Sequence, residues 1–127
     1  AEYHIDVVRQ PRSSGPVKVL RLRPYLRAMK SMRLDDRSMR EIEAAIVAAP
    51  QAHPMIQGLR GVRKMRFSVA GRGKSGGGRA IYYVALARGL LFMLVAYPKS
   101  ERDDLSPDQR KAILKAIQSI KGADYDR

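Results

Sequence analysis

Residues 62–69 read Val-Arg-Lys-Met-Arg-Phe-Ser-Val, and this stretch decides the fold. Side chains alternate between faces along a β-strand, so one face of this segment carries Met65, Phe67 and Val69. The opposite face carries Lys64 and Arg66. The alternation therefore predicts a strand that packs one side into a core and presents a cationic side to its surroundings.

The segments that follow extend this strand into a sheet. A glycine-rich run over 71–78 separates it from residues 79–86 and 90–97, which are nearly continuous in β-forming residues. A turn at Arg88-Gly89 joins these two segments, and their continuous apolar character is typical of a hairpin covered on both faces. We expect this hairpin to form the centre of the sheet.

Helices are predicted both before and after these strands in the sequence. Residues 25–32 and 35–49 form a helical hairpin, which ends before Pro50. Ser106-Pro107-Asp108-Gln109 has the pattern of a capping box and begins a C-terminal helix. Residues 3–8 and 17–22 both read as strands, and either could be the first. The sequence predicts a single α+β domain, in which an N-terminal helical hairpin and a C-terminal helix pack on an antiparallel sheet.

The net charge and the amino-acid composition limit the classes of partner and chemistry that this protein can have. The chain of 127 residues carries 25 Lys and Arg against 12 Asp and Glu, a net charge of +13. Nine of the cations and no carboxylate lie in residues 54–100, which indicates a polyanionic partner such as nucleic acid. The absence of cysteine excludes disulfides, thiolate catalysis and Cys-based zinc sites, and fits a reducing, cytoplasmic location. His4 and His53 have no partner at metal-ligand spacing, so we expect no metal and no cofactor. The longest apolar stretch, residues 90–97, is far shorter than the roughly 20 residues of a membrane helix, so we expect no membrane-spanning segment.

The glycine-rich run contains the pattern Gly71-Arg72-Gly73-Lys74-Ser75-Gly76, which resembles nucleotide-binding motifs. Those motifs require a following helix to hold the phosphate, whereas here a strand follows. We expect instead a cationic loop in which Arg72 and Lys74 hold an RNA backbone. A linker whose charges are incidental stays open as the alternative.

Three cations are positioned to act on one phosphodiester. Lys64 and Arg66 share a strand face, and Arg79 opens the next strand. Cleavage by 2′-hydroxyl attack needs a proton acceptor and stabilisation of the phosphorane charge, without strictly needing a metal. Lysine can accept a proton where neighbouring cations disfavour its charged form, whereas arginine stays charged. A strand that only binds RNA, or is only structural, is an equally common explanation of this pattern.

Tyrosines are the candidates for base stacking. Tyr82 and Tyr83 point to opposite faces of their strand, so at most one of them faces a ligand. Tyr97 lies near the end of the last predicted strand. Tyr82 and Tyr97 are the two we single out as RNA contacts.

Several motifs in fixed order now identify a family resemblance. Residues 58–66 (Gly-Leu-Arg-Gly-Val-Arg-Lys-Met-Arg) are followed by 71–83 (Gly-Arg-Gly-Lys-Ser-Gly-Gly-Gly-Arg-Ala-Ile-Tyr-Tyr), 97–101 (Tyr-Pro-Lys-Ser-Glu) and Asp104-Leu105-Ser106. In this order they resemble the HigB branch of the RelE/ParE toxin superfamily. The likeness covers about residues 34–120, so that residues 1–20 form an additional N-terminal segment.

The resemblance implies a type II toxin with a small RNase-like fold that cuts mRNA without a metal, in RelE itself within the ribosomal A site. A cognate helix-turn-helix antitoxin is implied as well. The family's paired strand cations fall on Lys64 and Arg66, and its next arginine falls on Arg79. A further basic position falls on Lys99 or, in another alignment, Ser100. The tyrosine that RelE places beyond the last strand has no counterpart here, so the general acid is unassigned and Tyr82 or Tyr97 is the available substitute.

The sequence thus leads to a hypothesis of an mRNA endoribonuclease that acts on the ribosome. Lys64 is the candidate base, and Arg66, Arg79 and Lys99 are the candidate phosphate and transition-state contacts. Four further cations are expected to hold the RNA backbone: Arg60, Arg63, Arg72 and Lys74. Two alternatives stay open: a ParE-like inhibitor of DNA gyrase, which shares the fold but acts by binding a protein, and a non-enzymatic RNA-binding or ribosome-binding protein, which the charge alone also supports.

Overall fold

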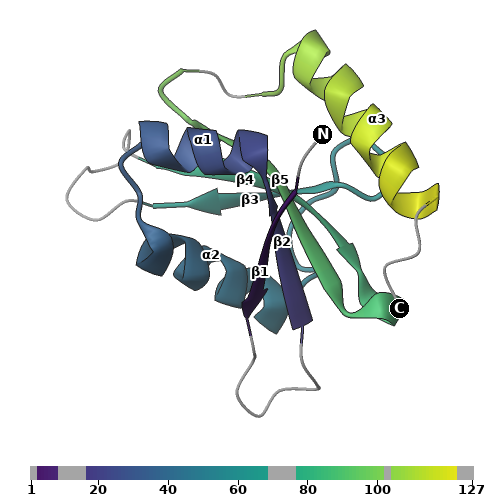
Figure 1. Cartoon of the computed structure of the whole chain (residues 1–127). Helices are drawn as coiled ribbons and strands as arrows, with labels where there is room; N and C mark the ends of the chain where they lie inside the picture. Colours follow the sequence, from purple (N-terminus) through teal and green to yellow (C-terminus); the bar gives the residue numbers. More distant parts are fainter. Residues whose placement is uncertain (1–2, 9–16, 69–76, 102–103, 123–127) are drawn as a thin grey trace.

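The computed structural model describes residues 3–8, 17–68, 77–101 and 104–122. Five strands form one sheet, with three α-helices and a short 3-10 helix, η2, around it (Figure 1). In chain order the elements are β1 (Tyr3–Val8), β2 (Val17–Leu22), α1 (Arg23–Ser31), α2 (Asp36–Ala48), β3 (Arg63–Phe67), β4 (Gly78–Ala85), η2 (Leu86–Arg88), β5 (Leu90–Pro98) and α3 (Pro107–Gly122).

The sheet has the strand order β1-β2-β5-β4-β3, so β3 lies at one edge. The pairs β1·β2, β3·β4 and β4·β5 are antiparallel, whereas β2·β5 is parallel. The α+β class, the helical hairpin and the C-terminal helix are confirmed. The expectation of a wholly antiparallel sheet needs correction, because the chain returns to β5 through two helices and two strands, a long connection that permits parallel pairing.

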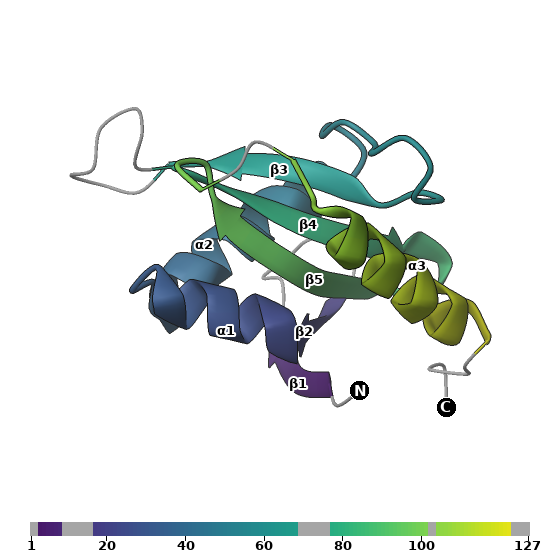
Figure 2. The same cartoon turned by 90° about the horizontal axis from the view of Figure 1, so that it is seen from above.

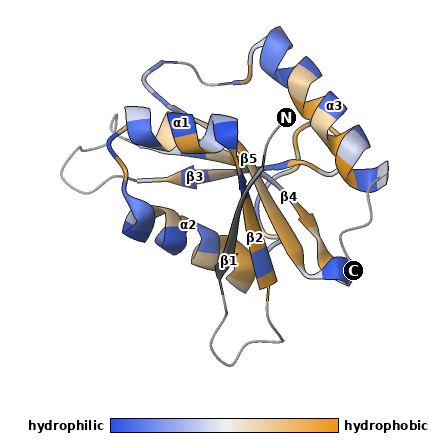
Figure 3. Cartoon of the chain, viewed as in Figure 1, coloured by the Kyte–Doolittle hydropathy of each residue, from blue (hydrophilic) through white to orange (hydrophobic). Residues whose placement is uncertain are grey.

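Two apolar clusters cover the two faces of the sheet. On one face, α1 and α2 pack over β2, β4 and β5 through a cluster that includes Met29, Ile46 and Tyr82. On the other face, α3 contributes Ile113 and Ile117 to a second cluster. Figure 2 shows α3 beside β4 and β5 and away from α2. Figure 3 shows β4 and β5 largely hydrophobic, with hydrophilic residues on the outer sides of the helices. Both faces of the central strands are therefore buried, while each helix covers only part of its face.

A buried ionic network fixes the helical hairpin to the sheet. Arg21 of β2 donates from Nε and Nη2 to the two carboxylate oxygens of Glu43 in α2, each at 2.7 Å. Its Nη1 donates to Oδ1 of Asp36 at 2.7 Å, and the Tyr25 hydroxyl donates to Glu43 at 3.3 Å. Burial, and then the nearby Glu43 charge, raise the pKa of Tyr25. This bidentate pairing is the arrangement that compensates an arginine for its loss of water.

The helix termini follow the sequence signals. The Asp35 carboxylate accepts from the backbone N–H of Ser38 and caps α2, which lowers the pKa of Asp35. At the start of α3, the Ser106 hydroxyl accepts from the N–H of Gln109, and the Gln109 side chain accepts from the N–H of Ser106. The predicted capping box is therefore present. Among the described residues, no helix is both long and apolar enough to cross a bilayer.

Candidate functional site

Three of the predicted catalytic cations lie on the same face of the sheet. In the β3·β4 register Arg66 is opposite Arg79, and Lys64 is opposite Ile81. Directly opposed residues on neighbouring strands share a face, with Cβ atoms about 4.5–5.5 Å apart. Because Ile81 belongs to the cluster on the α3 face, Lys64, Arg66 and Arg79 also face that way. We call these three residues the cation row.

The row extends onto the next strand. Arg79 is opposite Tyr97 in β5, so that Arg66, Arg79 and Tyr97 are aligned across three neighbouring strands. Met65 and Phe67, which alternate with the two β3 cations, pack into the cluster on the α1 and α2 face. The alternation that predicted a strand with one cationic side is therefore confirmed.

The three cations differ in their exposure to solvent. Arg66 is exposed, Lys64 is partly buried, and Arg79 is 5% exposed. The Arg79 Nη1 donates to the carbonyl oxygen of Gly78 at 3.1 Å. A guanidinium held away from bulk water interacts more strongly with a nearby phosphate than one on an open surface. Lys64 is the member of the row that can exchange a proton, because arginine remains protonated.

A close approach of the backbone holds β3 against β4 at this end of the sheet. A Cβ on Gly77 would lie 2.5 Å from the carbonyl oxygen of Phe67, and a Cβ on Gly78 would lie 2.5 Å from the Phe67 ring. Both contacts are too short for any side chain larger than hydrogen. The glycines before Arg79 therefore permit the packing that places Arg79 beside Arg66.

Lys99 lies at the same end of the sheet. It follows β5 directly, is exposed, and its backbone N–H donates to the carbonyl oxygen of Gly77 at 3.0 Å. Gly77 immediately precedes β4, so Lys99 is close in space to the beginning of the strand that carries Arg79. Ser100, the other residue that could occupy this position, is also exposed and lies in the turn that follows.

A hollow of about 350 Å³ lies between the open edge of β3 and α2, toward the face of the sheet opposite to the cation row. Arg66 and Met65 line one side of it, and the first turns of α2 line the other, including Ser38 and the carboxylate-bearing Glu41. Arg66 therefore borders a concave surface at the open edge of β3. Of the three cations of the row, Arg66 alone contributes to the described lining of this hollow, which also contains the Glu41 carboxylate.

The four cations predicted to hold the RNA backbone differ in their positions. Arg60 is exposed on the loop before β3. Arg63 lies on the opposite face from the cation row, and its Nη1 donates to the carbonyl oxygens of His53 at 2.7 Å and Gln51 at 3.3 Å. Arg63 thus anchors the segment after α2 instead of joining the row. Arg72 and Lys74 lie outside the described residues.

The two tyrosines also occupy different positions from those expected. Tyr82 is fully buried on the α1 and α2 face, its hydroxyl donates to the carbonyl oxygen of Pro50 at 2.8 Å, and its ring meets His53 edge-on at 6.1 Å. Burial raises the pKa of Tyr82. The structure therefore places Tyr82 away from the cation row, because its side chain lies on the opposite face of β4. Tyr97 shares the face of the row, but it is 3% exposed within the α3 cluster.

The fold and this surface define a small basic α+β protein whose cations converge on one end of a sheet. Over residues 17–126 the chain matches a sequence model described as "RelE toxin of RelE / RelB toxin-antitoxin system". The chain belongs to the RelE toxin family. It is therefore a toxin of a toxin–antitoxin system, which implies an antitoxin partner. The match starts at residue 17 and so includes β2, which lies before the region of likeness found in the sequence.

One solved structure is similar as well. It is that of an arginine-to-alanine mutant of the E. coli toxin RelE in the free state, 18% identical in sequence, with a TM-score of 0.46. The similarity covers 72% of this chain and 90% of that one.

Proposed function

We propose that this toxin is a HigB-like endoribonuclease that cleaves mRNA on the ribosome by attack of a 2′-hydroxyl on the adjacent phosphate, without a metal. The observation that carries the proposal is the register that aligns Lys64, Arg66 and Arg79 on one face of β3 and β4. Membership of the RelE toxin family supports the same activity. The helix-turn-helix character of the antitoxin follows from the family resemblance alone.

Each residue has a distinct role in the proposed reaction. Lys64 takes the proton from the 2′-hydroxyl, whose oxygen then bonds to phosphorus. Arg66 and Arg79 stabilise the additional negative charge on the phosphorane oxygens, and Lys99 binds the adjacent backbone. The bond from phosphorus to the 5′-oxygen breaks, that oxygen receives a proton, and the upstream fragment ends in a 2′,3′-cyclic phosphate.

The test is mRNA cleavage in a purified translation system with mapping of the fragment ends. Lys64→Ala and Arg79→Ala are expected to abolish cleavage, whereas Lys64→Arg retains the positive charge and still loses cleavage, because arginine cannot accept the proton. Lys30→Ala is the matched control, since Lys30 is exposed at the end of α1, which packs on the opposite face of the sheet.

Four outcomes would contradict the proposal in different ways. Wild-type cleavage by Lys64→Arg would leave the row as a binding surface with the base elsewhere. Ends without a cyclic phosphate would exclude attack by the 2′-hydroxyl. An intact mRNA pool combined with inhibited DNA gyrase would favour a ParE-like toxin, and RNA binding without either activity would favour a non-enzymatic binder.

A further inference from the structure

A second hollow, lined mainly by cations, lies between α3 and the loop that carries Arg60. It has a volume of about 380 Å³ and is lined by Arg60, Lys111, Leu114, Lys115 and Gln118. Three of these five described side chains are cations, one is a neutral amide, one is apolar, and none of the five is a carboxylate. We call it the α3 hollow. Such a set of groups attracts an anion that also offers an apolar surface.

The loop that supplies Arg60 is held against α3 by its own contacts. Arg110 of α3 donates from Nη2 to the carbonyl oxygen of Gln57 at 2.5 Å. A Cβ on Gly61 would lie 3.5 Å from the Tyr83 ring, and the Lys121 ammonium lies 5.7 Å from the centre of that ring. Arg60 therefore lies across the hollow from Lys111 and Lys115, and these contacts hold the loop against α3.

The backbone of Arg60 is in an uncommon conformation. Its φ is +58°, in the left-handed region that favours glycine, and the loop has glycines with positive φ at Gly58 and Gly61. A non-glycine residue in this conformation is uncommon, and among the described residues Arg33, in the turn between α1 and α2, is the other example. Arg60 is the loop residue that completes the cationic lining of the α3 hollow.

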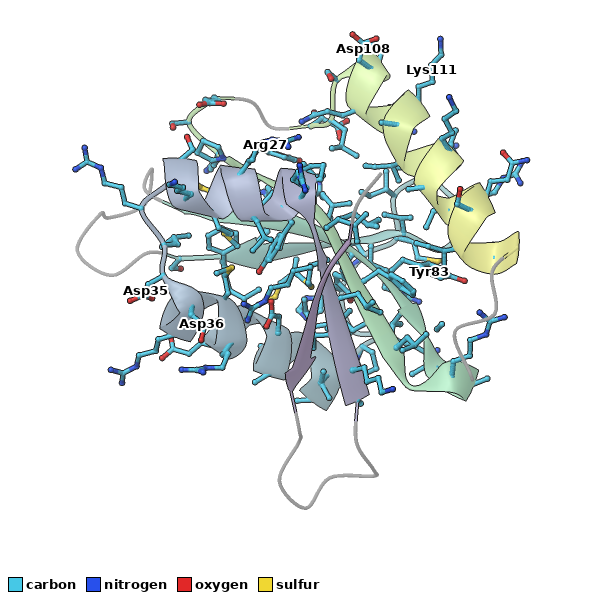
Figure 4. The ribbon with its side chains drawn as sticks, in the orientation of Figure 1. Arg27, Asp35, Asp36, Tyr83, Asp108 and Lys111 are labelled. Carbon is cyan, nitrogen blue, oxygen red and sulfur yellow. The ribbon has the colours of Figure 1, made fainter. Side chains whose placement is uncertain are left out.

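The two lysines add a second unfavourable feature to the free protein. Lys111 and Lys115 are exposed and four residues apart on α3, so that they lie on the same helix face. Like charges at this spacing repel each other, and a bound anion removes the repulsion. Asp108 is one turn earlier on the helix, and Figure 4 shows Asp108 and Lys111 projecting from the first turns of α3 into solvent.

We propose that the α3 hollow binds a backbone phosphate of the RNA, at a distance from the bond that is cut. This proposal rests on the proposed function, in which RNA is the substrate. The loop carrying Arg60 also contacts β3, since the backbone N–H of Lys64 donates to the carbonyl oxygen of Pro54 at 3.0 Å. The α3 hollow and the cation row are therefore joined by one loop, which favours a single extended polyanion over an acidic protein patch. Leu114, 36% exposed, provides an apolar contact for a ribose.

The test measures binding of the full chain to a short single-stranded RNA that carries 2′-O-methyl groups and so cannot be cleaved. The variant is Lys111→Gln/Lys115→Gln, and the control with the same change in charge is Arg27→Gln/Lys30→Gln on the exposed side of α1. Affinity is measured over a range of salt concentrations. Removing one cation that binds a phosphate is expected to reduce the slope of log affinity against log salt by about 0.7.

The expected result is a slope lower by about 0.7 in the α3 variant, which corresponds to one lost phosphate contact, and by less than about 0.3 in the control. Equal reductions in both variants would overturn the proposal, because only net charge would then matter. An unchanged RNA slope with weaker binding of the antitoxin would also overturn it and assign the α3 hollow to a protein. Cleavage of mRNA by the wild type is measured in parallel. A lower slope in the α3 variant without wild-type cleavage would support RNA binding by the α3 hollow and refute the proposed function. Wild-type cleavage with an unchanged slope in the α3 variant would support the proposed function and refute RNA binding by the α3 hollow.

Discussion

Replacing Gly77 with alanine tests the packing that aligns Arg66 with Arg79. The new Cβ would lie 2.5 Å from the carbonyl oxygen of Phe67, where ordinary contact begins at 3.4 Å, so the backbone of β3 has to move by about 0.9 Å. A displacement of this size lengthens a hydrogen bond of about 2.9 Å beyond bonding distance. The end of the β3·β4 ladder at Phe67 and Gly78 should therefore open.

The expected cost follows from two contributions. Forced overpacking costs about 1–3 kcal/mol, and loss of one ladder hydrogen bond costs about 1 kcal/mol, so that Gly77→Ala should lower the free energy of unfolding by about 2–4 kcal/mol. For a domain of this size the Tm should fall by roughly 4 °C for each kcal/mol. Displacing catalytic groups by about 1 Å can reduce activity on the order of 100-fold.

Thermal unfolding followed by circular dichroism, together with the mRNA cleavage assay, measures both effects. Gly122→Ala is the control, because a Cβ there meets no atom within 4 Å and alanine favours the helix. Its Tm should be unchanged or slightly higher, with normal cleavage. If Gly77→Ala retained the wild-type Tm and cleavage within about twofold, the close approach of β3 and β4 would not be what positions the cation row.

Three further predictions concern the opposite face of the sheet. Glu43→Ala should destabilise the fold by about 3–5 kcal/mol in denaturant unfolding, because it leaves Arg21 buried without its carboxylate, whereas Arg21→Met/Glu43→Leu should recover most of that loss. The hydrogen bond from Arg21 lowers the pKa of Asp36 below its ordinary 3.8. The stability that the ionised Asp36 carboxylate contributes is therefore complete above pH 3.8 and is lost as the pH falls through the lowered pKa. Asp36→Asn should accordingly make the free energy of unfolding fall less steeply at acidic pH. Tyr82→Phe should cost about 1 kcal/mol in unfolding free energy by removing the hydrogen bond to Pro50, without changing RNA affinity.

Each of these has a result that would count against it. A double variant as unstable as Glu43→Ala would mean that packing, and not an uncompensated charge, limits stability at this site. An unchanged acid limb in Asp36→Asn would assign acid unfolding to other carboxylates. Weaker RNA binding by Tyr82→Phe would place the RNA on the helical face.

Local sequence signals predicted the elements correctly where a short-range physical cause acts. The capping pair of Ser106 and Gln109, the cap at Asp35 and the alternation in β3 each depend on residues a few positions apart. That Arg79 lies near Lys64 and Arg66 was also expected, because it opens the strand that follows theirs in the chain, whereas the close approach of Gly77 and Gly78 to Phe67 was not.

Other features depended on contacts that no local pattern encodes. The parallel pairing of β2 with β5 joins segments about seventy residues apart, and it determines which strand is central. Tyr82 could not be assigned to a face because β4 is apolar on both sides, so the period-2 signal is lost. The structural role of Arg63 and the uncommon backbone of Arg60 likewise arise from the loop between α2 and β3, which has no periodicity.

The ion pairs around Arg21 bear on the stability of this protein in the absence of a binding partner. Glu43 and Asp36 are two of only twelve acidic residues, and both neutralise an interior arginine on the helical side of the sheet. The Glu43 charge is fully buried, and the half-exposed Asp36 also pairs with Arg40, so both acids are engaged on the helical side of the sheet while the chain as a whole carries a net charge of +13. An acid-rich ligand that binds only the folded state would raise the melting temperature by mass action. The isolated toxin should accordingly be more easily unfolded and degraded than the same chain held in a neutralised complex.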